Sequence, residues 1–343
     1  MEKFKAAVLT KQHHPLELLE IEHLGPVSGQ VKVKMITSGL CGAQWNEINA
    51  IKGVDNYLPH MMGHEGYGQV VEIGEDVKKV SIGDFVVLHW RKGTGIECFG
   101  PKYNSEVGFI GSGSVTTFSE YTIVAENRVS KVPNNTDLKF IYPLLGCALS
   151  TTWGVFNKEI NINEDSKIFI IGAGGLGLSF LFWAKIYNYK KIVVLDKFKT
   201  KEKFVNPFDV EFFSIEDGFK FENYNSNFDL IIDTTGDTNI ISNAFNLLNK
   251  NSQFVLIGQP KKGESLLIQN ALKLFDGIKM FASEGGGFDP TTDFEKLVNE
   301  VSQNIQLAQN LVSDIISLEE VNKGFEIMKS GNTARIIIDF NKK

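Results

Sequence analysis

Two cysteines and a histidine, far apart in the chain, have the chemistry to hold one metal ion. They are Cys41, His64 and Cys147, and each of them has a glycine as an immediate neighbour. Two thiolates and an imidazole suit Zn2+, and three protein ligands instead of four leave one coordination position open for water or substrate. The three residues therefore predict one catalytic zinc ion and not a structural one.

A glycine-rich loop further along the chain is typical of dinucleotide binding. The sequence GAGGLG at residues 172–177 follows an all-apolar run and precedes a helical pattern. In that context the first glycine allows a tight turn, the second lets the backbone approach a pyrophosphate, and the last allows close packing of helix on strand. The phosphates then lie at the N-terminus of the helix, where free N–H groups favour negative charge. The loop residues predicted to bind the cofactor are Gly172, Gly174, Gly175, Leu176 and Gly177.

An acidic residue follows this loop at the spacing of a dinucleotide-binding unit. Asp196 ends a second predicted strand, roughly 20 residues after the last glycine of the loop. Its carboxylate can accept hydrogen bonds from the adenosine ribose and would repel a 2′-phosphate, which favours NAD(H) over NADP(H). Lys197 and Lys199 lie beside it and could accommodate a phosphate, so NADP(H) stays open.

The composition excludes several classes of function. The chain has 343 residues, 22% of them charged, with a formal net charge of -6, whereas nucleic-acid and anionic-membrane binders need a basic face. The sequence contains no apolar run of about 18 residues, as a membrane helix would need. It begins without a signal-peptide pattern, and its three cysteines fit a reducing compartment. We therefore expect a cytoplasmic protein that acts on a small molecule, with no nucleic-acid and no membrane partner.

The periodicity of apolar residues changes near the middle of the chain. Residues 1–150 carry short alternating strands at 31–36, 68–74 and 84–88, which predict a partly barrel-shaped β domain. Later residues alternate buried strands with helices, which predicts an α/β domain with a doubly wound parallel sheet. Its expected strands are 167–171, 191–196, 229–233, 253–257 and 278–281, and its expected helices include 178–187 and 238–250.

The last part of the chain is expected to return to the first domain. Two helical stretches follow the glycines at 285–287, and the apolar run 334–340 predicts a terminal strand. The predicted domains are a catalytic domain of residues 1–150 and 286–343, and a cofactor-binding domain of residues 151–285.

In combination, these motifs resemble the zinc-containing alcohol dehydrogenases of the medium-chain dehydrogenase/reductase superfamily, over essentially the whole chain. The matching motifs are SGLCG at 38–42, GHE at 63–65, GDFV at 83–86, FSEY at 118–121, VSKVP at 129–133, GCALSTT at 146–152 and the stretch 317–335. The resemblance implies a GroES-like catalytic domain, a Rossmann NAD-binding domain, and a homodimer or homotetramer built by the cofactor domain's edge. It also implies that Cys41, His64 and Cys147 hold the zinc with Glu65 just behind it, and that Thr151 and Arg335 help to bind the cofactor.

The activity that the resemblance implies is that of an NAD(H)-linked alcohol or polyol dehydrogenase. Zinc acts as a Lewis acid on the substrate oxygen, and hydride passes between an alcohol or carbonyl carbon and nicotinamide. Two alternatives remain. One is a zinc-free quinone or enoyl reductase of the same superfamily, although those relatives lack the cysteine and histidine ligands. The other is a dinucleotide-binding protein without catalytic activity.

The helix after Cys41 departs from the family pattern. Family members often carry a hydroxyl residue and then an acid at the positions of Ala43 and Gln44, and a relay histidine at Asn46. Alanine cannot relay a proton, and glutamine accepts a hydrogen bond without carrying charge. Glu47, water or the substrate's own hydroxyl could complete the proton relay, with the alternative that Glu47 is simply a solvated helix residue.

A second departure lies where many relatives carry a lobe with four cysteines that bind a structural zinc. Only Cys98 is present in this stretch, and one cysteine cannot make a four-ligand site. The stretch instead begins with Trp90, Arg91 and Lys92, a stacking surface beside two cations that suits a phosphorylated or nucleotide-linked sugar. The alternative is two exposed cations and a tryptophan that packs in the core.

Overall fold

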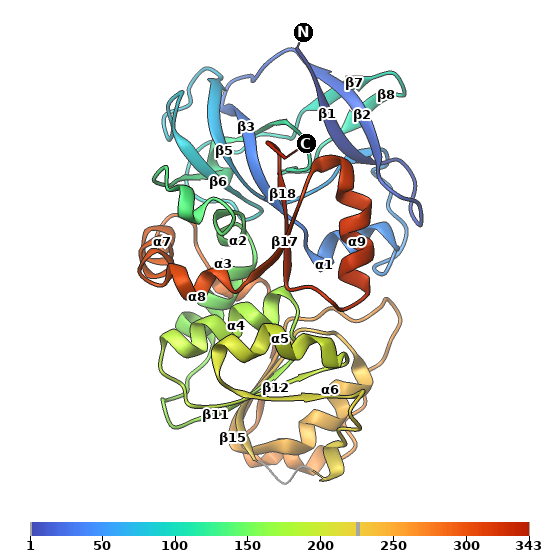
Figure 1. The fold of residues 1–343 in the computed structure, drawn as a ribbon, viewed down its shortest axis with the longest axis vertical. Coiled ribbons are helices and arrows are strands. Elements are labelled where there is room, and N and C mark those ends of the chain that lie inside the picture. Colours follow the sequence, from blue (N-terminus) through green and yellow to red (C-terminus); the bar gives the residue numbers. More distant parts are fainter. Residues whose placement is uncertain (1, 224–226, 343) are drawn as a thin grey trace. The chain divides into compact units, whose positions relative to one another are not determined.

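The computed structural model describes residues 2–223 and 227–342 and divides into two compact units (Figure 1). The first unit comprises Met1–Ser150, Asp289–Ser330 and Arg335–Lys343, and the second comprises Thr151–Phe288 and Gly331–Ala334. The division falls within helix α3 (Ala148–Gly154). None of the helices among the described residues combines the length and the apolar character that crossing a membrane requires.

A closed barrel of five strands forms one part of the first unit. Alternate residues of the first strand, among them Phe4, Ala6 and Val8, point into one apolar cluster, which also includes Tyr103 and Ile110. This period of two places one face of each strand inside the barrel. In order around the barrel, the strands are β1 (Glu2–Leu9), β2 (Glu17–His23), β7 (Lys102–Ser105), β8 (Gly108–Gly111) and β4 (His60–Met61).

A second sheet of the first unit supplies Ser38, Glu65 and Arg335 to the site described below. The alternating residues Val31, Val33 and Met35 are buried in its core. Its strands, in order, are β10 (Val129–Lys131), β6 (Phe85–His89), β5 (Glu65–Ile73), β3 (Gln30–Gly39), β18 (Arg335–Asp339) and β17 (Val312–Ile316), while β9 (Tyr121–Ala125) pairs with β3. The sequence did not predict β17, whose middle residues are polar.

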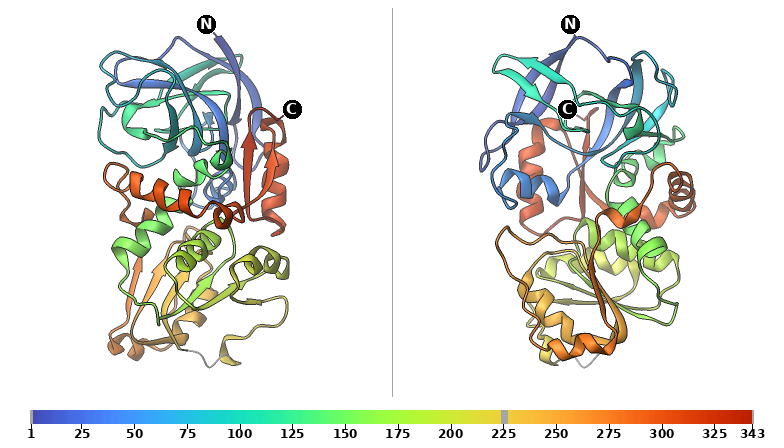
Figure 2. Two further views of the ribbon diagram at one scale, coloured as in Figure 1. Left: turned by 60° about the vertical axis from the view of Figure 1, so that its left-hand side comes forward. Right: turned by 180° about the vertical axis from the view of Figure 1, so that it is seen from behind.

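The C-terminal strand belongs to the first unit. Strand β18 pairs antiparallel with β3, with Ile337 opposite Gly39, and this pairing brings the start of β18 beside Leu40 (Figures 1 and 2). The helices of this unit are α1 (Gly42–Ile48), α2 (Tyr142–Leu145), α7 (Phe294–Gln303), α8 (Ile305–Gln309) and α9 (Val321–Lys329).

The second unit contains a six-stranded parallel sheet, which confirms the predicted doubly wound α/β fold. Phe169 and Ile171 pack in one apolar cluster with Ile241 and Phe245, while Ile168 and Ile170, on the opposite face, are also buried. Both faces are therefore covered, as parallel sheets require. The strand order is β13 (Glu211–Ser214), β12 (Lys191–Asp196), β11 (Lys167–Ile171), β14 (Phe228–Asp233), β15 (Leu248–Leu256) and β16 (Lys279–Ala282), with helices α4 (Gly175–Ile186), α5 (Glu202–Val205) and α6 (Thr238–Ala244).

The helix predicted over residues 238–250 is wrong in its second half. Helix α6 ends at Ala244, and Leu248 begins strand β15 opposite Phe228. Asn251 has a φ of 58°, a left-handed conformation that no α-helix continues through. The apolar residues Phe245 and Leu247 fit the helical period, yet they fill the core from a short 3-10 turn.

Candidate metal and dinucleotide sites

The three predicted metal ligands all lie at the ends of regular elements in the first unit. Cys41 separates β3 from α1, His64 directly precedes β5, and Cys147 lies between α2 and α3. Two of the neighbouring glycines have steric reasons. A Cβ at Gly39 would lie 2.6 Å from Glu65 Oε1, and Gly63 has a φ of 91° with Thr117 Oγ1 in the way of a side chain.

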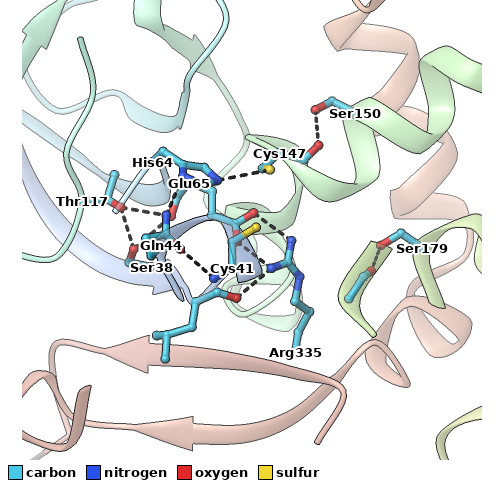
Figure 3. Close-up of polar contacts among 12 residues, drawn as sticks. Ser38, Cys41, Gln44, His64, Glu65, Thr117, Cys147, Ser150, Ser179 and Arg335 are labelled. Carbon is cyan, nitrogen blue, oxygen red and sulfur yellow. Dashed lines mark hydrogen bonds and ion pairs between the residues drawn. The ribbon is translucent and has the colours of Figure 1, made fainter. Parts of the chain in front are cut away.

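The structure brings Cys41, His64 and Cys147 together. One ligand atom from each of them lies within 4.8 Å of the other two, and His64 Nε2 is 3.3 Å from Cys147 Sγ. Figure 3 shows the two sulfur atoms and the imidazole ring turned toward the same space. Two soft sulfur ligands and one imidazole at this spacing are a donor set that fits Zn2+.

Glu65 and Arg335 form a buried ion pair beside these three residues. Arg335 Nη1 lies 3.1 Å from Glu65 Oε1, Nη2 donates to Oε2 at 3.3 Å, and the side chains are only 4% and 0% exposed. Arg335 Nη1 also donates to the carbonyl of Leu40 at 2.7 Å. Arg335, which the resemblance places at the cofactor, therefore lies against the residue preceding Cys41, and Glu65 stands outside the group of three ligand atoms.

The local charges favour a thiolate at Cys41. A hydrogen bond with Cys147 lowers the pKa of Cys41 well below its usual value, and the positive charge of Arg335 acts in the same direction. The same hydrogen bond, together with burial, raises the pKa of Cys147. Burial raises the pKa of Glu65 to about 7, against the lowering effect of Arg335. The site thus has one sulfur that loses its proton readily, as metal binding requires.

Three polar residues, Ser38, Gln44 and Thr117, surround the ligands, and of these the sequence indicated a role beside the metal only for Gln44. Ser38 Oγ donates to the carbonyl of Glu65 at 3.0 Å and contacts Thr117 Oγ1 at 2.8 Å, so Ser38 of β3 holds both the first residue of β5 and Thr117 (Figure 3). Gln44 reaches both Cys41 and His64. No motif around Thr117 predicts its contact with Ser38. Gln44 lies three residues after Cys41 at the start of a helix, and this spacing predicts its contact with the Cys41 backbone.

Glu47, the acidic residue of α1, lies beside a second group of titratable side chains. Ala43 is exposed, and Glu47 Oε1 is 3.7 Å from His60 Nε2, which is 2.8 Å from Asp55 Oδ2. The ligand atoms of Glu47, Asp55 and His60 also lie within 4.8 Å of one another. Glu47 is exposed, whereas the side chains of His60 and Asp55 are only 11% and 10% exposed.

The loop after β6 turns its arginine inward. The Arg91 guanidinium carbon lies 4.4 Å from the centre of the Trp90 ring, and Nη1 donates to Ser150 Oγ at 3.2 Å. Ser150 Oγ in turn donates to the carbonyl of Cys147 at 3.0 Å. The alternative of two exposed cations is therefore wrong for Arg91, which is buried, and right only for Lys92, which is exposed.

In the second unit, the glycine loop connects β11 to α4 at the point where the strand order reverses. Ligands of doubly wound sheets bind at such a switch point. A Cβ at Gly177 would lie 1.7 Å from the carbonyl oxygen of Gly172, whereas a Cβ at Gly174 would meet nothing within 4 Å. The last glycine therefore serves packing, and the middle one faces open space. Gly175 and Leu176 begin α4.

Asp196 lies at the end of β12 and contacts the glycine loop. Its Oδ2 accepts a hydrogen bond from the Ala173 N–H at 2.7 Å, and its Oδ1 accepts one from the Phe198 N–H at 2.9 Å. Lys201 is buried close by, and its Nζ donates to the carbonyl of Thr333. Thr151, the other residue that the resemblance assigns to the cofactor, is buried in α3.

Comparisons with known proteins agree with this architecture. The model of the alcohol dehydrogenase GroES-like domain matches residues 27–134. Alcohol dehydrogenase 6 of Peromyscus maniculatus is 28% identical over 373 residues, which cover 97% of both chains. The structure of benzyl alcohol dehydrogenase from Acinetobacter calcoaceticus has a TM-score of 0.87 at 21% identity and 99% coverage of both chains. A short chain alcohol dehydrogenase (rspB) from E. coli CFT073, in complex with NADH, has a TM-score of 0.79 at 19% identity, covering 99% of this chain and 100% of that one.

Proposed function

We propose that this chain is a zinc-dependent, NAD(H)-linked alcohol or polyol dehydrogenase. The chain is an oxidoreductase and belongs to the zinc-type alcohol dehydrogenase family of the medium-chain dehydrogenase/reductase superfamily. The observation that carries the proposal is the set of Cys41, His64 and Cys147 ligand atoms within 4.8 Å of one another. This set argues against the zinc-free reductases of the superfamily, which have no use for two thiols and an imidazole at one point.

In the proposed reaction, zinc supplies a Lewis acid for the substrate oxygen and NAD(H) supplies the hydride chemistry. Cys41, His64 and Cys147 would hold the metal, and the Arg335 charge favours the deprotonated form of Cys41. Glu65, paired with Arg335, keeps that cation in place behind the ligands. Glu47, on the same helix as Ala43, is the titratable group that we propose passes a proton toward His60 and solvent.

For the cofactor, we propose that the pyrophosphate lies over Gly174, Gly175 and Leu176 at the start of α4. The space in front of Gly174 and the free N–H groups of a helix N-terminus support this. Asp196 is proposed to accept the ribose hydroxyls, which favours NAD(H) over NADP(H). Gly172, Gly177 and Thr151 would shape the surroundings.

The substrate that we propose is a small alcohol carrying negative charge, such as a phosphorylated or nucleotide-linked sugar. Arg91 is linked through Ser150 to the main chain of Cys147, so a permanent cation lies two hydrogen bonds from a metal ligand. A cation so placed favours an anionic substrate. Trp90 offers a stacking surface, and Lys92 adds charge at the surface.

The substrate class is tested with Arg91→Gln, which keeps a hydrogen-bond donor near Ser150 but removes the charge. We expect KM for a phosphorylated alcohol to rise about tenfold, with KM for the neutral alcohol unchanged, since charge-assisted hydrogen bonds contribute about 1.5–3 kcal/mol. Lys92→Gln removes the same charge at the exposed neighbour, and we expect a smaller rise in KM for the phosphorylated alcohol than in Arg91→Gln. Equal changes in KM for both substrates would refute the assignment of Arg91.

The activity itself is tested by NADH formation from a panel of alcohols, polyols and phosphorylated alcohols, before and after removal of metal with a chelator. We expect turnover that is lost with the metal and restored by Zn2+. Turnover that survives chelation would favour a zinc-free reductase. NADH binding without turnover of any substrate, in protein without metal, would favour a non-catalytic dinucleotide-binding protein.

We also propose that the protein is a cytoplasmic homodimer or homotetramer. The thiols of Cys41 and Cys147 must stay reduced to bind metal, which suits the cytosol. Strand β16 ends the parallel sheet, and Leu267, Leu272 and Phe275 just before it are strongly exposed. Exposed apolar side chains that precede an edge strand in the sequence support contact with a second copy. Light scattering would show a monomer if this is wrong.

A further inference from the structure

Gln44 is buried between the backbone nitrogen of Cys41 and the Nδ1 atom of His64. Gln44 is only 1% exposed. Its Oε1 accepts a hydrogen bond from the Cys41 backbone N–H at 2.8 Å, and its Nε2 lies 2.5 Å from His64 Nδ1 (Figure 3). Gln44 therefore contacts one ligand through the main chain and another through the ring.

With the Gln44 amide in this orientation, these contacts select one tautomer of a neutral His64. The amide Nε2 of Gln44 has only hydrogens to offer, so His64 Nδ1 must be the ring nitrogen without a hydrogen. The ring hydrogen is then on His64 Nε2, which faces Cys147 Sγ at 3.3 Å. This is the nitrogen that faces the other two ligands, and in this tautomer it has no lone pair to give a metal.

Metal binding through His64 Nε2 requires the opposite tautomer, because Nε2 must then be free of hydrogen. The ring hydrogen must move to Nδ1, where it needs an acceptor. With the amide as it stands, Nδ1–H meets the Gln44 NH2, and two donors face each other. If the amide turns over, Oε1 accepts from His64, but the NH2 then faces the Cys41 N–H. If Oε1 accepts both bonds, the NH2 is left without its partner in a buried position. Each arrangement leaves one N–H group without an acceptor, which is costly when buried.

We propose that Gln44 is a positioning residue that keeps the proposed site in a weakly binding form, so that the chain holds its zinc less tightly than a carboxylate at this position would allow. A carboxylate has only acceptors and would satisfy both Cys41 N–H and His64 Nδ1–H at once. The inference rests on the proposed function, since it concerns the affinity of the same zinc site.

The test compares zinc affinity in wild type and Gln44→Glu, which has the same size and shape. Affinity is measured by competition with a chelating dye, with no activity readout. We expect Gln44→Glu to bind zinc about 10–100-fold more tightly, the range found for residues that orient metal ligands. Asn46→Asp is the matched control, because it adds the same charge two residues along α1, at a position where no hydrogen bond to His64 is found. We expect its affinity to change less than threefold.

A second measurement needs no variant. The 15N spectrum of the histidine rings in metal-free wild-type protein, above the pKa of the imidazole, is expected to show hydrogen on His64 Nε2, and addition of zinc should move it to Nδ1. Hydrogen on Nδ1 in the metal-free protein would overturn the inference.

Two other results overturn the inference or its premise separately. Equal zinc affinity of wild type and Gln44→Glu, or an equal gain in Asn46→Asp, refutes the role of Gln44 while the zinc site stands. Failure of both wild type and Gln44→Glu to bind zinc, in folded protein, refutes the proposed metal site itself.

Discussion

Replacing Arg335 by methionine tests whether this residue serves the buried ion pair or the cofactor. In Arg335→Met, Glu65 loses both of its contacts with the guanidinium, at 3.1 and 3.3 Å, and the carbonyl of Leu40 loses its donor. Removing one partner of a buried pair costs about 3–5 kcal/mol, because the remaining charge is left without compensation. We therefore expect the free energy of unfolding to fall by roughly that amount above neutral pH.

The cost should depend on pH in a defined direction. The pKa of Glu65 is raised to about 7 by burial, and the Arg335 charge lowers it, so the variant has a still higher pKa. A raised carboxyl pKa gives stability that is present at low pH and is lost as pH rises through the folded-state value. The wild type loses this stability between about pH 4.5 and 7. The variant continues to lose it above pH 7, so the difference between the two proteins should widen there.

The assay is urea unfolding of the metal-free proteins at several pH values, followed by circular dichroism, with NADH affinity measured in parallel. The double variant Glu65→Gln with Arg335→Met is the matched control, since it removes both charges and should recover part of the loss. If Arg335→Met instead weakened NADH binding with less than about 1 kcal/mol of lost stability, the ion-pair account would be wrong. The cofactor role implied by family resemblance would then stand.

Three further predictions concern other residues. Gly174→Ala should leave the midpoint of thermal unfolding unchanged, because its Cβ meets nothing, and should weaken NADH binding about tenfold. Gly177→Ala should lower the midpoint of thermal unfolding. Equal NADH affinity of Gly174→Ala and wild type would contradict the pyrophosphate placement. Asp196→Ser should reduce the preference for NADH over NADPH about tenfold, and a wild type that already prefers NADPH would contradict the role of this carboxylate. Burial lowers the pKa of His89 to about 3, so the folded protein resists protonation and stability should fall as pH drops from about 6.5 toward 3. In acid unfolding, His89→Gln should show a shallower loss over this range, and an unchanged slope would count against it.

The parts of the fold that the sequence predicted well have strong local signals. The run from Lys167 to Ile171, the glycine loop and Asp196 follow one another within a single strand–helix–strand unit, so their relation is set by short-range geometry. The predictions failed where long-range pairing decides the structure. Leu248 continues an apolar helical period, yet it joins the sheet because Phe228 pairs with it.

The candidate site shows the same division. The residue types of Cys41, His64 and Cys147, and the glycine beside each of them, identified these residues as a possible donor set. The pairing of Glu65 with Arg335 joins residues from two strands at distant points in the chain, and no local pattern indicates it. Arg91 turns inward and donates to Ser150, and no pattern in the sequence connects these two residues. The type of a side chain predicts which chemistry is available to it, whereas its contacts in the folded chain determine which role it has.

The most direct test of the central claim is the zinc content of gently purified protein, measured by plasma mass spectrometry for the wild type and for Cys147→Ala and Cys98→Ala. We expect one zinc ion per chain in the wild type, its loss in Cys147→Ala, and full retention in Cys98→Ala, because Cys98 lies outside the three-residue group. Folded wild-type protein that binds NADH but takes up no zinc, even when zinc is supplied, would contradict the account.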